Sequence, residues 1–106
     1  PFTLIIIQID SHKSKEVVEF SESLYEQATA QGIEVLMDDR DKKTSPGVKF
    51  AESELIGIPH RVVVSPRGLA DGMIEYTRRA EGKKLTVKKT EALDFLTSFI
   101  QGNSNT

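Results

Sequence analysis

Charged and aromatic side chains that could bind a nucleic acid gather between residues 38 and 54. The set comprises Asp38, Asp39, Arg40, Lys42, Lys43, Lys49, Phe50 and Glu54. Carboxylates accept hydrogen bonds from the donor edge of a base, and cations bind phosphates or base acceptors. An aromatic ring can stack on an unpaired base of single-stranded RNA. This combination of residue types favours RNA binding over catalysis.

The residues Asp38, Asp39 and Arg40 follow an apolar run and precede a polar segment that ends at Pro46 and Gly47. In open α/β sheets, ligands bind beyond the carboxyl ends of the parallel strands. The amino end of the helix expected next presents free N–H groups and a positive dipole, which favour phosphate. We therefore expect carboxylates, cations and a helix start to converge on one corner. Turn capping, or a salt bridge to Arg40, is an equally good alternative for the aspartates.

Phe50 is the candidate for base stacking. Four apolar residues recur at helical spacing and predict the buried stripe of a short helix: Val48, Ala51, Leu55 and Ile58. At about 100° per residue, Phe50 falls off this stripe, on the same side as Glu54 one turn later. An exposed Phe50 is therefore expected, with a partly buried boundary aromatic as the alternative. Arg40, Lys49 and Glu54 could equally be ordinary solvated charges.

A second basic group lies near the C-terminus. Residues 78–89 contain six basic residues and one acidic residue, whereas residues 10–34 contain six acids and two lysines. Arg78 and Arg79 could contact RNA phosphates, and a solvated hairpin is the equally good alternative.

The composition excludes several other kinds of chemistry. Because the chain has no cysteine, it has no disulfide scaffold, thiol nucleophile or cysteine-bound metal. His12 and His60 are far apart in sequence, so we predict no metal site and no catalytic residue. The formal net charge of −2 argues against nucleic-acid binding through bulk electrostatics alone. No secretory signal or membrane span is evident, which favours a soluble, cytoplasmic protein.

Hydrophobic patterning predicts one α/β domain. The β-branched run at residues 2–9 indicates a strand buried on both faces, and further strands are expected over 33–37, 61–65, 73–79 and 85–88. Between the first two strands, an amphipathic helix should span about 14–31 and end at Gly32. A short helix should run from Pro46 to about Gly57, and a last one should begin at Thr90 as its cap.

The order β-α-β-α-β-β-β-α predicts a five-stranded mixed sheet flanked by three helices. Helical crossovers make the first three strands parallel, and the last two strands close one edge as an antiparallel hairpin. We expect the domain to cover residues 1–102, followed by a polar tail at 103–106. The chain begins at Pro1, which indicates a piece of a longer polypeptide.

The chain contains, in order, the block DDR, a polar linker, PGVKF, ELIGIP and a following run of valines. This ordered set resembles the anticodon-binding domain that class II synthetases for proline, threonine, histidine and glycine share. It is most similar to the bacterial prolyl type, and IPHRVVVS at residues 58–65 and IEYTRR at 74–79 agree with that type. The resemblance covers the chain up to about Gly102. It departs from the prolyl pattern in a longer linker at 41–45, where Lys42 or Lys43 stands in for the usual arginine.

The resemblance implies recognition of proline anticodons, which share guanine at their second and third positions. Guanine offers hydrogen-bond donors on one edge and acceptors on another. The implied contacts are Glu54 and one of Asp38 or Asp39 to the donors, Arg40 and Lys49 to the acceptors or phosphate, and Phe50 as the stacking ring. Lys42, Lys43, Arg78 and Arg79 are the implied phosphate contacts.

The resemblance also implies partners. These are the anticodon stem-loop of tRNA(Pro) and the catalytic domain of the parent chain, in an enzyme expected to be a homodimer. The domain itself should need no cofactor and bind no DNA or membrane, because ATP and magnesium belong to the parent's catalytic domain. The fragment alone should therefore bind RNA without catalysing a reaction.

Other interpretations remain open. The chain could be the same domain of another class II synthetase, or a freestanding paralogue. A nucleotide-binding or signalling α/β module is a further alternative, although Asp10, Ser11 and His12 follow the first strand without a phosphate-binding glycine motif. A metal-dependent hydrolase is least favoured, because adjacent aspartates on an extended strand point to opposite faces.

Overall fold

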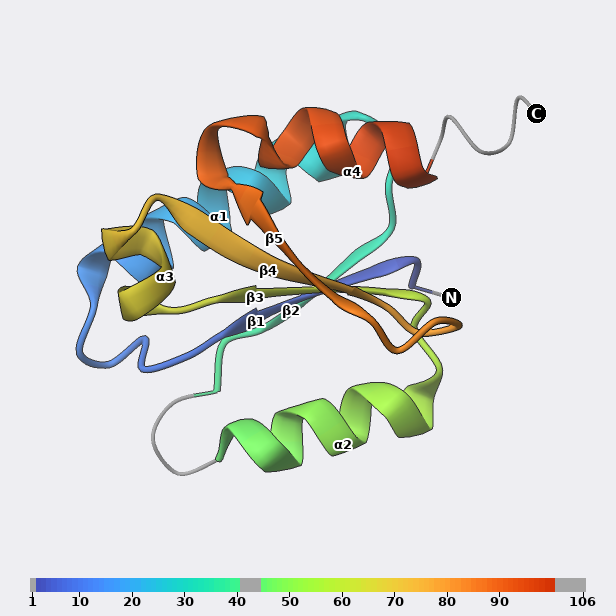
Figure 1. Cartoon of the computed structure of the whole chain (residues 1–106), viewed down its shortest axis with the longest axis horizontal. Coiled ribbons are helices and arrows are strands. Elements are labelled where there is room, and N and C mark those ends of the chain that lie inside the picture. The colour runs from blue at the N-terminus through green and yellow to red at the C-terminus, as the bar shows by residue number, and fades with distance from the viewer. Residues whose placement is uncertain (1, 41–44, 101–106) are drawn as a thin grey trace.

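The computed structural model describes residues 2–40 and 45–100 (Figure 1). In these ranges the chain forms β1 Leu4–Gln8, α1 Lys15–Ala30, β2 Val35–Asp38, α2 Pro46–Ile56, β3 His60–Val64, α3 Pro66–Ala70, β4 Met73–Arg78, β5 Lys84–Lys88, the 3₁₀ turn η1 Lys89–Glu91 and α4 Ala92–Ile100. Lys42, Lys43 and the predicted tail at 103–106 lie outside the described residues.

The strands form one mixed sheet in the order β2-β1-β3-β4-β5. β1 pairs in parallel with β2 and with β3, whereas β4 is antiparallel to both β3 and β5. All five residues of β1 are buried, as expected for a strand between two neighbours and covered on both faces. The predicted arrangement of three parallel strands and an antiparallel hairpin is therefore confirmed.

Helices cover the two faces of the sheet unequally. In Figure 1, α1 and α4 lie on one face, and α2 lies on the other. The larger core lies under α1 and α4 and includes Leu4, Ile6, Val62, Val64, Tyr76 and Leu96. The smaller core lies under α2 and consists of Ile5, Ile7 and Ile58, with Ile9, Leu36 and Phe50 packed against it. Because α2 covers so small a core, polar side chains occupy much of the space between it and the sheet.

The helix α1 begins and ends where the sequence predicts. The Ser14 hydroxyl accepts a hydrogen bond from the Val17 amide at 3.2 Å, which satisfies one free N–H of the first turn. Gly32 follows the helix with a φ of 87°, a left-handed conformation that glycine adopts without a steric penalty. Val17, Leu24 and Ala28 are buried, which agrees with the amphipathic character expected of this helix.

The helix α2 is rotated relative to the prediction. Leu55 is 87% exposed and Val48 is 47% exposed, whereas the buried residues of this helix are Lys49 and Ser53. The predicted stripe is therefore wrong for the helix itself, and of its members Ile58 alone is buried, beyond the helix end. The physical reason is that Ile5, Ile7 and Ile58 fill the small core, so the helix contributes hydrogen-bonding groups to the space beside it.

Two local features near β4 and β5 also differ from the prediction. Residues 66–70 form α3, a fourth helix beyond the three predicted, because Pro66 suits a first helical position and the Ser65 hydroxyl accepts from the Gly68 amide at 3.0 Å. Thr90 lies inside η1 and is not a cap of α4. Among residues 2–40 and 45–100, no helix is long and apolar enough to cross a membrane.

Candidate functional site

The predicted site residues that the structure describes lie on two sides of α2. The side facing β2 carries a group that we call the Asp38 cluster: Asp38, Arg40, Lys49 and Glu52. The side facing β3 and β4 carries a group that we call the Arg61 seam: Phe50, Glu54, Arg61 and Arg79. Asp38, Arg40 and Lys49 therefore lie together at one corner, as predicted. Phe50 and Glu54 lie on the other side of α2.

Within the Asp38 cluster, Arg40 forms a two-pronged ion pair with Asp38. Its Nε donates to Asp38 Oδ1 at 2.9 Å and its second terminal nitrogen donates to Oδ2 at 2.7 Å. The Arg40 amide also donates to Oδ1, at 3.3 Å. The salt bridge that was one alternative for the aspartates is therefore present for Asp38, whereas Asp39 is exposed.

Arg40 also contacts Glu52 on α2, at 2.6 Å from the same terminal nitrogen. The guanidinium therefore lies between two carboxylates and joins the end of β2 to α2. A hollow of about 280 Å³ lies beside this pair, and apolar side chains from β1, β2 and α2 complete its lining: Ile5, Leu36, Met37 and Ile56.

Lys49 occupies the interior of the Asp38 cluster. Its side chain is 2% exposed, and its ammonium donates to the carbonyl of Gln8 at 2.7 Å and to the carbonyl of Arg40. It thus connects the carboxyl end of β1 and the segment after β2 to α2. Lys49 was expected at the surface, and its burial makes it a positioning group for this corner.

Asp38 and Arg40 hold each other in the charged form. Burial alone would raise the pKa of Asp38, but the hydrogen bonds and charge of Arg40, with the charge of Lys49, hold that pKa below its ordinary value. Hydrogen bonds to Asp38 and Glu52 raise the pKa of Arg40 further above neutrality. Asp38 and Arg40 therefore stay ionised over the neutral range.

The Arg61 seam centres on a guanidinium that lies over an aromatic ring. The central carbon of the Arg61 guanidinium is 5.0 Å from the centre of the Phe50 ring, which is a cation–π distance. One terminal nitrogen donates to Ser53 Oγ at 3.2 Å and approaches Glu54 Oε1 at 3.5 Å. The buried Nε of Arg61 has no hydrogen-bond partner among the described residues.

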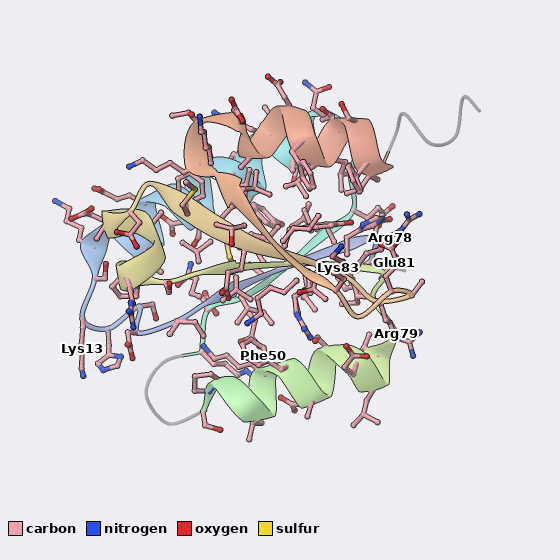
Figure 2. All side chains as sticks on the ribbon, in the orientation of Figure 1. Lys13, Phe50, Arg78, Arg79, Glu81 and Lys83 are labelled. Atoms are coloured by element: carbon pink, nitrogen blue, oxygen red, sulfur yellow. The ribbon has the colours of Figure 1, made fainter. Side chains whose placement is uncertain are left out.

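Phe50 is partly buried and not exposed as expected. It lies on the side of α2 that faces the sheet (Figure 2), where it packs against the small core of Ile5, Ile7 and Ile58. This is the boundary position that was its alternative. Its proximity to Glu54, one turn later on the helix, agrees with the prediction.

Arg79 extends the Arg61 seam to the end of β4. Its Nε is 3.7 Å from Glu54 Oε2, and the two side chains are 49% and 52% exposed. Figure 2 shows Arg79 near the C-terminal part of α2, whereas Arg78 and Lys83 lie on the neighbouring hairpin. Glu54 thus approaches two guanidinium groups at distances longer than a good hydrogen bond.

The described residues contain no group of three or more His, Cys, Asp or Glu side chains that could hold a metal ion. The aspartates at 38 and 39 diverge, since one is buried against Arg40 and the other is exposed.

A family model described as the anticodon binding domain matches residues 3–99. The chain belongs to this family. The family is the anticodon-binding domain of class II tRNA synthetases, which recognises the anticodon of tRNA. The resemblance to the anticodon-binding domain of class II synthetases is thereby confirmed, and the five-stranded mixed sheet with flanking helices agrees with it.

The Arg61 seam gives this anticodon-binding domain the groups needed to bind a base. The Glu54 carboxylate can accept hydrogen bonds, the guanidinium groups of Arg61 and Arg79 can donate them, and Phe50 supplies an aromatic surface. The Asp38 cluster also combines carboxylates with cations, but it has no aromatic ring, and Arg40 and Asp38 are already paired with one another at short distances.

Two residues of the anticodon-binding domain were not among the predicted site residues. These residues are Arg61, which lies in a run of valines, and Glu52, which lies on α2. A signal for Arg61 was available, because side chains alternate along a strand. Arg61 and Val63 share the face toward α2, while Val62 and Val64 belong to the larger core. A charged residue on that face requires a partner on the helix.

Proposed function

We propose that this anticodon-binding domain recognises the two adjacent guanines of proline anticodons through the Arg61 seam. The observation that carries the proposal is the placement of Glu54 between Arg61 and Arg79, beside the ring of Phe50. Support for the prolyl assignment comes from the motifs DDR, PGVKF and ELIGIP in their order along the chain.

The chemistry of the Arg61 seam fits guanine better than the other bases. Guanine presents N1–H and N2–H₂ donors on one edge and the O6 and N7 acceptors on another, so it needs a carboxylate and a cation together. Glu54 would accept from the donors, and Arg61 would donate to the acceptors. The donor that Arg61 would offer is the terminal nitrogen that lies 3.2 Å from Ser53 Oγ and 3.5 Å from Glu54 Oε1, because its unpaired Nε is buried.

The Asp38 cluster has a supporting role in this proposal. The ion pairs of Arg40 with Asp38 and Glu52 are 2.6–2.7 Å long, whereas the two contacts of Glu54 are 3.5 and 3.7 Å long. A base would have to break strong, partly buried pairs to bind Arg40 or Lys49. These residues, with Asp38, would instead fix the position of α2, and exposed Asp39 would remain available at the margin.

The remaining partners follow from the same proposal. Arg78 and Arg79, with Lys42 and Lys43, would contact phosphates of the anticodon stem-loop. The parent enzyme would be a homodimeric proline–tRNA ligase in the cytoplasm, and its catalytic domain would bind ATP, magnesium and proline. The anticodon-binding domain would contribute specificity and no catalytic group.

The experiment that tests the proposal replaces each anticodon guanine by inosine in an anticodon stem-loop RNA. Inosine lacks the N2 amino group alone. We expect this change to weaken binding to the wild-type chain roughly tenfold at one position, because a hydrogen bond to a charged group is lost. Glu54→Gln should remove most of that difference, and fluorescence anisotropy at fixed salt measures both affinities.

A matched variant and a second set of RNAs complete the design. Glu91→Gln removes an exposed carboxylate elsewhere and should leave the preference for guanine over inosine unchanged. An unchanged preference in both Glu54→Gln and Arg61→Lys would contradict base reading by the Arg61 seam. Stem-loops with threonine, histidine and glycine anticodons test the alternative parents, since tighter binding of any of them would contradict the prolyl assignment.

A further inference from the structure

The surface formed by α1 and the edge strand β2 differs from the Arg61 seam in the side chains that it presents. A hollow of about 390 Å³ opens there, and its lining combines aromatic and aliphatic side chains with one acid: Phe2, Tyr25, Thr29, Gly32, Ile33, Glu34 and Val35. Both aromatic side chains are substantially exposed, with Tyr25 at 36%. Exposed aromatic groups around a concavity are typical of an interaction site.

The charge around this hollow has one sign. Residues 16–34 contain five glutamates and no lysine or arginine. Glu22 lies three residues before Tyr25 and therefore on a neighbouring part of the same helix face, and Glu34 lines the hollow itself. Glu22, Glu26 and Glu34 form no ion pair with another residue that the structure describes. The acids are thus available to an external cation.

The location separates this surface from the proposed RNA contacts. α1 lies on the face of the sheet opposite α2, so the hollow and the Arg61 seam are on different layers of the molecule (Figure 1). The nearest strand, β2, is an edge of the sheet and pairs with β1 on one side. Unpaired backbone groups along such an edge can bind an extended polypeptide.

We propose that the α1–β2 surface binds a protein segment that carries lysine or arginine residues on either side of an apolar side chain. Charge complementarity selects this occupant, because clustered glutamates repel the phosphates of RNA and attract basic residues. The apolar side chain would fill the hollow against Tyr25 and Phe2, and the basic residues would pair with Glu22, Glu26 and Glu34. This inference goes beyond anticodon recognition and does not depend on it.

The test uses the whole chain and a fluorescein-labelled peptide in which lysines alternate with phenylalanines. Tyr25→Ala should weaken binding of this peptide about tenfold, as expected for an aromatic anchor at the centre of an interface. The double variant Glu22→Gln/Glu26→Gln should weaken it at low salt and reduce its salt dependence. The matched control Glu91→Gln/Asp94→Asn removes two exposed acids from the C-terminal segment and should change neither quantity.

Several outcomes would overturn the inference. One is equal binding of the peptide to the wild type and to both sets of α1 variants, with thermal unfolding confirming that each variant is folded. Another is equally tight binding of a peptide with glutamate in place of lysine. A loss of anticodon stem-loop binding in Tyr25→Ala would make the surface an RNA site. Self-association that Tyr25→Ala abolishes in sedimentation would make its occupant a second copy.

Discussion

The two sides of α2 have similar residue types and different physical roles. Each side combines carboxylates with a guanidinium, but the pairs of Arg40 are 2.6–2.7 Å long and those of Glu54 are 3.5 and 3.7 Å long. Asp38 and Lys49 are buried, whereas Glu54 and Arg79 are about half exposed. Arg40 and Glu52, with side chains 43% and 47% exposed, are nearly as accessible as Glu54 and Arg79, so the flanks differ in the length of their pairs and in the burial of Asp38 and Lys49. Short pairs with a buried member lose much by exchanging partners, and long pairs at the surface lose little.

This difference separates residues that build the site from residues that are available to a ligand. The Asp38 cluster ties the end of β1, the end of β2 and α2 together through side-chain and backbone acceptors. The Arg61 seam then lies on the other flank of a helix whose position is already fixed. A binding group gains affinity when its position is set before the ligand arrives, because less ordering accompanies binding.

Among the charged residues on the two sides of α2, replacing Lys49 should have the largest effect on stability. Lys49→Met keeps most of the aliphatic side chain but leaves the buried carbonyl of Gln8 without its donor. Two backbone acceptors lose a charged partner, so we expect the free energy of unfolding to fall by about 2–4 kcal/mol. Urea denaturation measures this change, and Lys89→Met, at an exposed position, serves as the control.

The comparison would fail if Lys49→Met left stability unchanged and reduced RNA binding instead. That result would place Lys49 in direct contact with RNA and would make the two flanks of α2 parts of one binding surface.

Asp38→Asn should cause a smaller loss of stability than Lys49→Met. Glu54→Gln, the corresponding change on the other side of α2, should cause almost none. Asp38→Asn should cost about 1–3 kcal/mol at neutral pH, because a partly buried pair with Arg40 is broken. Glu54→Gln should change stability by less than about 0.5 kcal/mol, since its contacts are long and hydrated. Equal losses in urea denaturation would remove the distinction between the flanks.

The free energy of unfolding at acidic pH gives a second test of the pair between Asp38 and Arg40. Because the pKa of Asp38 is lower in the folded state, its stabilisation is complete above the unfolded value of about 3.9. That stabilisation is lost as the pH falls through the folded pKa. Urea denaturation at a series of pH values should therefore show that Asp38→Asn flattens the decline of stability below about pH 4.

His60, on the face of β3 opposite Arg61, should make the stability of the fold depend on pH. Burial, with a smaller contribution from the charge of Arg78, lowers the pKa of His60, whose Nδ1 lies 2.6 Å from the Tyr76 hydroxyl. The unfolded chain then binds the proton more readily, so stability should fall as the pH drops below about 6.5. His60→Asn should reduce this slope, as measured by urea denaturation at pH values on both sides of about 6.5.

The His60 measurement separates the two faces of one strand, since His60 and Arg61 are consecutive. If acidification instead weakened the preference for guanine before it weakened the fold, the titrating group would belong to the RNA site and not to the larger core. Parallel measurements of unfolding and of stem-loop binding at each pH distinguish these results.

The sequence predicts the sheet well because its central strand and first helix have unambiguous patterns. The uninterrupted run Leu4–Gln8 is typical of a strand covered on both faces, and Gly32 gives α1 its left-handed end. The family motifs also predict which segment carries the site. The resulting fold class is confirmed by strand order and by the family match.

The orientation of α2 could not be predicted from hydrophobic periodicity. That rule places apolar residues inside and lysine outside, but Lys49 is buried because two backbone carbonyls at the strand ends need a donor. The acceptors come from segments distant in sequence, so no local pattern reports them. Arg61 was missed for a related reason, since its partners Ser53 and Glu54 lie on the helix and not on its own strand.

The smallest effect is expected for Leu55, the residue at which pattern and structure differ most. The sequence places Leu55 in the core, which predicts a cost of about 2–5 kcal/mol for a small polar replacement. In the structure its side chain is 87% exposed, so Leu55→Gln should change the free energy of unfolding by less than about 0.5 kcal/mol. Ile58→Ala, in the small core under the same helix, is the matched control and should cost about 2–5 kcal/mol. If Leu55→Gln destabilised the chain as strongly as Ile58→Ala, α2 would have the opposite orientation. Lys49 would then face solvent, and the division between the Asp38 cluster and the Arg61 seam would no longer hold.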